Sequence, residues 1–138
     1  MNYKNYLDTL EYKFSPQNIV VSCLSKDEEG NRKYGDKHTW EYMKSRGRQD
    51  FVRHRQSLPC EIIIDCDVSN QHKHVRRFFK EHGVTFLAFK ANKGYHFHTF
   101  WLGLDELNKS KRQELRRELL ALLHSDIQLA SDKTTIAL

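Results

Sequence analysis

The chain has few of the features that mark secreted or membrane proteins. Only three of its 138 residues are Cys, and no two of them form a CxxC pair. We therefore expect reduced thiols in a cytoplasmic protein. No apolar run approaches the length of a membrane span, and the first residues lack the apolar core of a signal peptide. No membrane is expected among its partners.

Charged residues, by contrast, are abundant in this chain. Charged residues make up 30% of the chain and hydrophobic residues 38%, a balance typical of soluble globular proteins. The length suits one domain, 1–138, with a core of its own. The formal charge of +5 is compatible with a polyanionic partner.

The most informative segment is EIIIDCDV at 61–68, a short apolar run that ends in two carboxylates. Side chains alternate along a strand, so Asp65 and Asp67 should share one face with Ile63. Two acids side by side repel each other unless a cation lies between them. The alternative is a strand that simply exits into a polar turn, with Asp67 as a cap.

Residues 1–59 predict an N-terminal α/β extension. Its expected elements are a helix at 2–13, a strand at 19–24, a mobile polar loop at 26–38 and a short helix capped by Thr39.

Residues 60–138 predict an α+β core with a mainly antiparallel sheet. The expected elements are a strand at 61–67, a helix capped by Ser69 or Asn70, a strand at 84–89, a turn at 91–94, a strand at 95–102, a helix at 109–124, and strand-like ends at 127–129 and 135–138. This order is the split β-α-β-β-α-β unit. The first and third strands should be neighbours, the last strand should flank the first, and both helices should cover one face.

That topology gathers distant polar residues at one end of the sheet. The third strand runs antiparallel to the first, so His96 and His98 should lie on the same face as Asp65 and Asp67. Asp126, at the start of the fourth strand, should reach the same edge. Such convergence favours a functional site over a solvated rim.

These residue types suit phosphoryl or nucleotidyl transfer. Carboxylate oxygens select Mg²⁺ or Mn²⁺. Lys93 and a protonated His96 could hold a triphosphate. A nucleic-acid backbone could contact the basic side chains of the two helices, Arg76, Arg77, Arg112 and Arg116. For each of these Arg the alternative is an ordinary solvated face. We expect the helix at 109–124 to bury Leu115, Leu119, Leu122 and Leu123.

The sequence IIIDCDV followed by KANKGYHFHTFW resembles the archaeo-eukaryotic primase superfamily, which comprises the small catalytic primase subunit and its primase-polymerase relatives. The resemblance covers 60–138 and implies an RRM-like core. It implies that Asp65, Asp67 and Asp126 are catalytic metal ligands. His96 would contact the nucleotide together with Lys93, and His98 lies in the same motif.

The resemblance further implies a template-directed nucleotidyltransferase. Its partners would be a DNA template, nucleoside triphosphates and an accessory primase subunit or replication protein. Two departures are visible: Lys90 and Ala91 stand where the family motif usually opens with Ser, and the basic segment that follows the third Asp would begin where this chain stops, at Leu138. We therefore expect a minimal or truncated core, or a degenerate relative.

Three other interpretations remain open. His96 and His98 form a His-hydrophobe-His motif, as in rolling-circle-type nucleases, although no Tyr follows Tyr95 to act as the nucleophile. A non-catalytic RRM-like nucleic-acid-binding module would carry aromatic residues where the acids and histidines stand. A zinc site built on His72, His74 and Cys60 lacks a fourth ligand at standard spacing.

Overall fold

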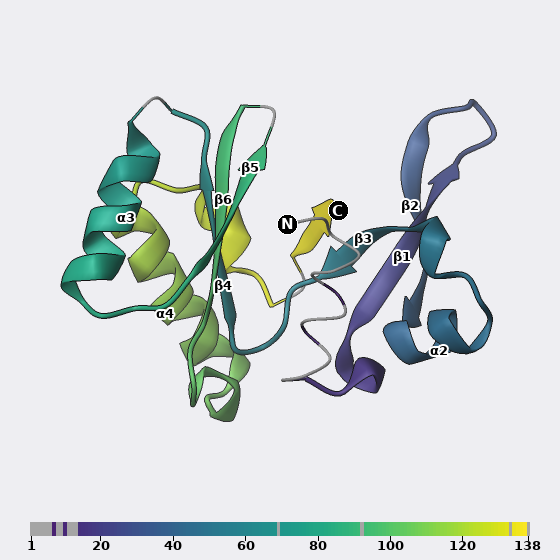
Figure 1. Ribbon diagram of the computed structural model, residues 1–138, viewed down its shortest axis with the longest axis horizontal. Helices are drawn as coiled ribbons and strands as arrows, with labels where there is room; N and C mark the ends of the chain where they lie inside the picture. Colours follow the sequence, from purple (N-terminus) through teal and green to yellow (C-terminus); the bar gives the residue numbers. More distant parts are fainter. Residues whose placement is uncertain are drawn as a thin grey trace. The chain divides into compact units, whose positions relative to one another are not determined.

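Figure 1 shows the computed structural model, which describes residues 7, 10 and 14–137 except 69, 92 and 133. The chain divides into two compact units, Met1–Gln56 with Thr135–Leu138, and Ser57–Thr134. The sequence placed the division between extension and core at 59/60. The described residues form an α+β fold with two antiparallel sheets and three α-helices. None of these helices is long and apolar enough to cross a membrane.

The first unit is built on a four-stranded sheet in the order β2-β1-β3-β7. Its elements are η1 (Pro16–Asn18), β1 (Val20–Lys26), β2 (Arg32–Thr39), α2 (Trp40–Ser45), η2 (Gln49–Phe51), β3 (Val52–Gln56) and β7 (Thr135–Ala137). As predicted, Thr39 caps α2, accepting the backbone N–H of Tyr42 at 3.1 Å. The helix buries Trp40 and Met43.

The predicted mobile loop at 26–38 is wrong, because β2 pairs along β1 as a hairpin. The Asp27 carboxylate accepts the backbone N–H groups of Glu29 and Asn31 at 3.0 and 2.8 Å, and Gly30 takes the positive φ of 83° that the turn requires. The polar composition of the segment reflects an edge strand rather than a loop. Of the predicted helix at 2–13, Leu7 and Leu10 are helical and buried, and the remainder lies outside the described residues.

The second unit contains a three-stranded sheet in the order β4-β6-β5. Its elements are β4 (Glu61–Cys66), α3 (Gln71–Glu81), β5 (Leu87–Ala91), β6 (Gly94–Phe100), η3 (Leu104–Glu106), α4 (Lys109–Leu122) and η4 (Ile127–Ala130). Both neighbours run antiparallel to β6, so β4 and β5 are parallel to each other. As predicted, the third strand of the unit lies beside the first, and α3 and α4 lie on the same side of the sheet (Figure 1).

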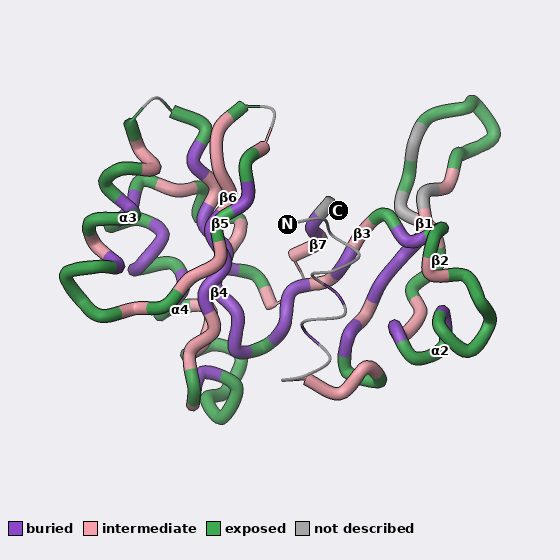
Figure 2. Tube along the Cα trace, in the orientation of Figure 1, coloured by how far each residue is buried: buried purple, intermediate pink, exposed green. Residues whose placement is uncertain are grey.

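The core of this unit lies between that sheet and the two helices. It joins β4 and Phe97 of β6 to α3 and α4, and its residues include Ile62, Ile64, Cys66, Val75, Phe79, Leu119, Leu120 and Leu123. The alternation predicted for β4 is therefore confirmed, and Figure 2 shows this strand as largely buried. In α4 the prediction was partly wrong: Leu115 and Leu122 are 41% and 56% exposed, while Leu120 and Arg116 face inward.

The predicted fourth strand of this sheet is not present among the described residues. Residues 127–129 belong to the 3₁₀ helix η4, and β7 pairs with β3 in the other unit. At the outer edge of β4, the Ser125 hydroxyl accepts the backbone N–H of Asp65 at 3.0 Å and donates to its carbonyl at 3.3 Å. A side chain therefore satisfies the backbone groups that a flanking strand would have paired.

A buried arginine connects the first residues of the second unit, 58–61, to Asp132 near its end by hydrogen bonds. Arg116 is 1% exposed and donates to the carbonyl groups of Glu61, Pro59 and Leu58 at 2.9, 2.7 and 3.3 Å. It also bonds to the carboxylate of Asp132, which accepts two further hydrogen bonds from Arg112 at 3.0 and 2.6 Å. The hydrogen bonds from Arg112, and then Arg116, lower the pKa of Asp132 to about 2.

We expect Asp132→Asn to lower the free energy of unfolding by about 2–4 kcal/mol, because it leaves the Arg116 charge buried without its partner. A carboxyl with a depressed folded-state pKa stabilises above its unfolded pKa of about 3.9. The advantage of the wild type should therefore be full above about pH 5 and disappear as the pH falls toward 2.

Urea unfolding at several pH values measures both quantities. Glu118→Gln, which removes an exposed acid from α4, is the matched control and should be nearly neutral. Equal stability of Asp132→Asn and wild type at pH 7 would contradict this role of the carboxylate.

Candidate functional site

The register of β4 against β6 places the two key motifs opposite each other. Asp65 pairs with His96 across the strands, and the Nε2 atom of His96 lies 3.3 Å from Oδ1 of Asp65. Both side chains are 29% exposed. The Oδ1 atom itself is buried, and this ion-pair contact is not aligned as a hydrogen bond. The sequence-based prediction that these two residues meet is confirmed.

A glycine makes this close pairing possible at the end of the strands. Gly94 opens β6 with a φ of 134°, and a Cβ atom built there would lie 1.8 Å from the carbonyl oxygen of Cys66. Only glycine fits so close to that backbone. The start of β6 therefore lies directly against the end of β4. Lys93, which directly precedes Gly94 in the turn, is exposed at this end of the sheet.

Burial and neighbouring charges act on the carboxyl group of Asp65. Burial raises the pKa of Asp65, and the charge of His96 opposes that rise. The nearby carboxylates of Asp67, which also forms a hydrogen bond, and of Asp126 raise the pKa further. Asp126 reaches this site from the N-terminus of η4, where it accepts the backbone N–H of Gln128 at 3.0 Å, and not from the start of a strand.

The donor set is compatible with a hard divalent cation. Burial and two nearby carboxylates disfavour the charge of Asp65, a cation would relieve that effect, and oxygen ligands suit Mg²⁺ or Mn²⁺. Within the part of the chain that the structure describes, no group of three or more His, Cys, Asp or Glu is already arranged to hold a metal. Mg²⁺ is usually held by one or two carboxylates and completed by water and substrate phosphates. The arrangement fits that substrate-completed kind of site.

The predicted role of His98 in nucleotide binding does not fit its position. His98 is fully buried, and its Nδ1 atom lies 2.9 Å from Oε2 of Glu61. Glu61 is also buried and accepts the backbone N–H of Leu58 at 3.0 Å. Glu61 was not among the site residues predicted from the sequence. The sequence feature that could have identified Glu61 is an acidic residue at the start of an apolar strand, on the same face as His98.

The four candidate arginines separate into two groups. Arg112 and Arg116 are engaged with Asp132 inside the fold, so their predicted contact with a nucleic-acid backbone is corrected. The guanidinium of Arg76 lies over the rings of Phe97 and Tyr95 at 5.1 and 5.6 Å, on the helix-covered face rather than the face of Asp65. Arg77 is exposed on α3, and its contact with a nucleic-acid backbone stays a prediction.

The zinc interpretation is not supported by the positions of its three residues. The ring of His72 lies 4.6 Å from that of Tyr95, and the ring of His74 lies 5.7 Å from that of His124. Cys60 precedes the opposite end of β4, and burial raises the pKa of its thiol to about 11. All three cysteines are free, as predicted.

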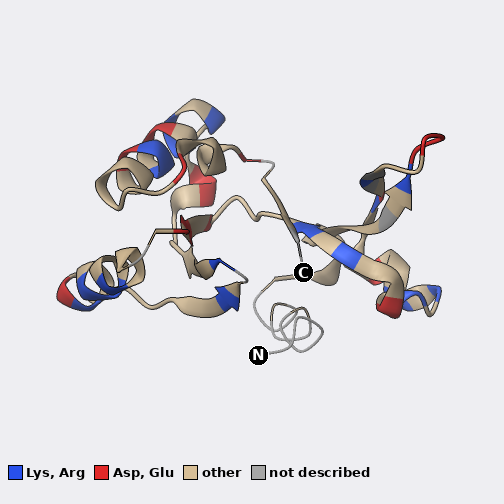
Figure 3. Ribbon diagram, turned by 90° about the horizontal axis from the view of Figure 1, so that it is seen from above, with Lys and Arg blue, Asp and Glu red and all other residues tan. Residues whose placement is uncertain are grey.

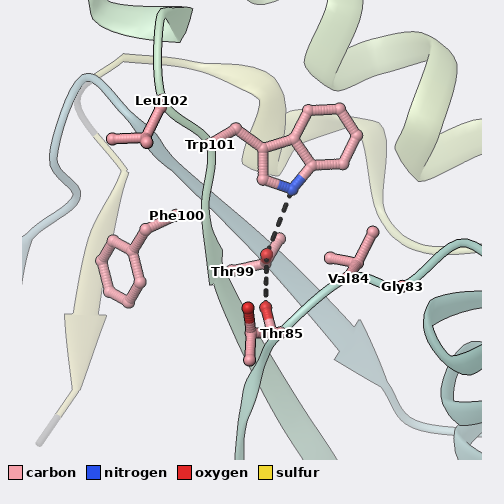
Figure 4. Close-up of a pocket in the computed structure, with 7 residues that line it drawn as sticks. All are labelled: Gly83, Val84, Thr85, Thr99, Phe100, Trp101 and Leu102. Atoms are coloured by element: carbon pink, nitrogen blue, oxygen red, sulfur yellow. Dashed lines mark hydrogen bonds between the residues drawn. The ribbon is translucent and has the colours of Figure 1, made fainter.

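A pocket of about 380 Å³ opens at the other end of β6 from the acid cluster (Figure 4). Residues 83–85 and 99–102 line it. The Thr99 hydroxyl accepts the indole N–H of Trp101 at 3.1 Å and donates to the carbonyl of Thr85 at 2.9 Å. The indole of Trp101, the hydroxyl of Thr99 and the carbonyl of Thr85 therefore bond to one another, and none of the lining side chains is charged. It is unsuited to a triphosphate.

No protein-family model, curated protein or solved structure matches this chain. The resemblance of its motifs to primases therefore stays a prediction. What the structure adds is the juxtaposition of Asp65 with His96 and the electrostatic coupling of Asp65 to two further acids.

We expect Gly94→Ala to destabilise the protein by at least about 2 kcal/mol, because the new methyl group would collide with the carbonyl of Cys66. Chemical denaturation measures this loss. Gly83→Ala is the matched control: Gly83 also has a positive φ, 65°, but nothing lies within 4 Å of its Cβ position. If both variants lose the same stability, the close approach at Gly94 is not the cause.

We expect Asp65→Asn to raise the melting temperature of the metal-free protein near neutral pH. A carboxyl whose folded-state pKa is raised favours the folded state at low pH and loses that contribution as the pH rises through the folded pKa. The difference from wild type should therefore vanish below about pH 4. Added Mn²⁺ should raise the melting temperature of the wild type but not of the variant.

Differential scanning fluorimetry across pH provides both measurements. Asp36→Asn, at an exposed position of β2, is the control and should behave as wild type. A lower melting temperature for Asp65→Asn at pH 7 would show that the carboxylate stabilises the fold and is not held there for a cation.

Proposed function

We propose that the protein is a primase-like nucleotidyltransferase that uses Mg²⁺ or Mn²⁺ to join nucleotides on a DNA template. One observation carries the proposal: Asp65 and His96 face each other across β4 and β6, with Asp67 and Asp126 within electrostatic reach. This brings the hydrophobic-Asp-hydrophobic-Asp motif and the Gly-x-His motif to one edge of one sheet.

Each residue of this cluster has a chemical role in the proposal. Asp65, Asp67 and Asp126 would hold the cation, which would supply charge neutralisation at the phosphates and activation of the attacking hydroxyl. His96, opposite Asp65, and Lys93, in the neighbouring turn, would orient the triphosphate through charge-assisted hydrogen bonds. The partly buried position of Asp65 would strengthen these interactions.

An RRM-like core is part of the proposal. The strand order β4-β6-β5 with two helices on one face supports it. The flanking strand expected next to β4 is replaced by Ser125 and η4, so the sheet would be a reduced version of that core.

The two nucleic-acid alternatives are less well supported. A His-hydrophobe-His nuclease needs both histidines for one metal, whereas His98 is fully buried beside Glu61 and His96 contacts Asp65. A binding module would offer aromatic side chains across the central strands. On the Asp65 side of these strands stand Glu61, Ile63, His96 and His98, and Phe100 is the one aromatic.

Primer synthesis tests the proposal. We expect the full chain, with a DNA template, NTPs or dNTPs and Mn²⁺, to make short products, and Asp65→Ala and Asp67→Ala each to lower the yield by at least about two orders of magnitude. Asp36→Ala should leave synthesis unchanged. Products that persist in both site variants would remove these carboxylates from the reaction.

If the wild type makes no primers, a measurement of Mn²⁺ binding distinguishes two explanations. Nucleotide-dependent binding that is lost in Asp67→Ala would indicate a site that needs a partner subunit or replication protein, whereas no binding would indicate a degenerate core. DNA nicking with a covalent 5′-phosphotyrosine adduct would establish the nuclease instead.

A further inference from the structure

The first unit carries an exposed column of planar side chains at α2. The ring of His38 stacks on that of Tyr42 with centroids 4.7 Å apart and planes inclined by 18°. The guanidinium of Arg46 lies over the same Tyr42 ring, 5.3 Å from its centroid. Tyr42 is 41% exposed, and Arg46 is exposed as well. Burial therefore does not explain why three flat groups are aligned here.

Positive charge surrounds this column. The segment 44–55 contains five Lys or Arg and a single Asp. Arg48 and Arg53 in this segment are exposed, as is the ring of Phe51 at 63%. Three acids of the neighbouring hairpin lie at its tip, which Figure 3 shows in red, and Asp27 accepts backbone N–H groups there. The exposed acids nearer to α2, namely Asp36, Glu41 and Asp50, are fewer than the exposed Lys and Arg of 37–53. The surface around α2 is thus both basic and aromatic.

We propose that this surface, formed by His38, Tyr42, Arg46, Arg48 and Phe51, binds single-stranded nucleic acid. Flat side chains offer stacking platforms to unpaired bases, and the arginines supply charge for the phosphates. Bases in a duplex are already stacked on each other and cannot use such a platform, so a single strand is the better fit. An anionic membrane would match the positive charge, but its lipid headgroups would not stack on the aligned side chains of His38, Tyr42 and Arg46.

The proposal rests on the proposed function only in naming the template as the natural strand. Binding here needs neither the cation nor the acid cluster, because the two sets of residues share no member. It also gives the first unit a role that the acid cluster does not supply. The strand would be held by residues outside the segment that resembles primases.

Fluorescence anisotropy of the full chain with a labelled single-stranded oligonucleotide in EDTA tests the surface. Tyr42→Leu should weaken binding about 5- to 100-fold, the loss typical of one stacked base, while Tyr42→Phe keeps the flat ring and should bind as wild type. The double variant Arg46→Gln with Arg48→Gln should reduce the slope of log K against log salt by about 1.4, or 0.7 for each phosphate contact.

Controls separate this surface from its rivals. Lys80→Gln removes an exposed charge from α3 that belongs to neither proposed site, and this variant should bind normally. EDTA removes the cation that the proposed function needs, so a failure of that function does not affect this measurement. Melting temperatures should match that of the wild type, since Tyr42, Arg46 and Arg48 are exposed.

The proposal is overturned by any of three results: wild type that does not bind the strand, equal binding by Tyr42→Leu and Tyr42→Phe, or loss of binding in Lys80→Gln alone. Binding to anionic phospholipid vesicles in preference to the oligonucleotide would likewise overturn it.

Discussion

The approach of Gly94 to the carbonyl of Cys66 is the constraint on which the candidate site depends. With no Cβ at this position, β6 can begin directly against the end of β4, and the antiparallel register then places His96 opposite Asp65. A side chain at residue 94 would force the two strands apart at the point where the carboxylates stand. The glycine in the Gly-x-His motif is therefore explained by backbone geometry, independently of any chemistry at the histidine.

The acidic residues at the two ends of β4 have opposite environments. Near its end, burial raises the pKa of Asp65, His96 opposes the rise, and the neighbouring carboxylates of Asp67 and Asp126 add to it. At its start, the fold satisfies its buried charges within itself: Glu61 meets His98, and Arg116 meets Asp132 and three backbone carbonyls. The buried charges at the start of the strand have several partners each, whereas Asp65 forms an ion pair with His96 and keeps a raised pKa at a partly exposed edge. A pKa perturbed in this way is common at functional sites.

Much of the second unit could be predicted from periodicity and turn residues. The alternation in β4 and β6 identified which side chains face the helices, and the short ANKG turn made the two hairpin strands antiparallel. The pairing of Asp65 with His96 followed from these local rules. The positions of Arg116 and His98 did not, because polar residues enter a core only when distant partners satisfy them, and those partners are invisible to a local pattern. The loop predicted at 26–38 failed for a related reason, since an edge strand tolerates a polar sequence when its neighbour supplies the hydrogen bonds.

By itself, the sequence determined the β-α-β-β-α order of the second unit, the faces of its strands and the pairing of Asp65 with His96. These depend on side-chain alternation and on turn chemistry, which act over a few residues. Only the tertiary structure decided which of the candidates remain available to a ligand. It directed Arg112, Arg116 and His98 inward, placed Asp126 at the N-terminus of a 3₁₀ helix, and paired the last strand with β3 instead of β4. The reason is that a buried charge or an open strand edge is stable only where a partner, here far away in the chain, can satisfy it.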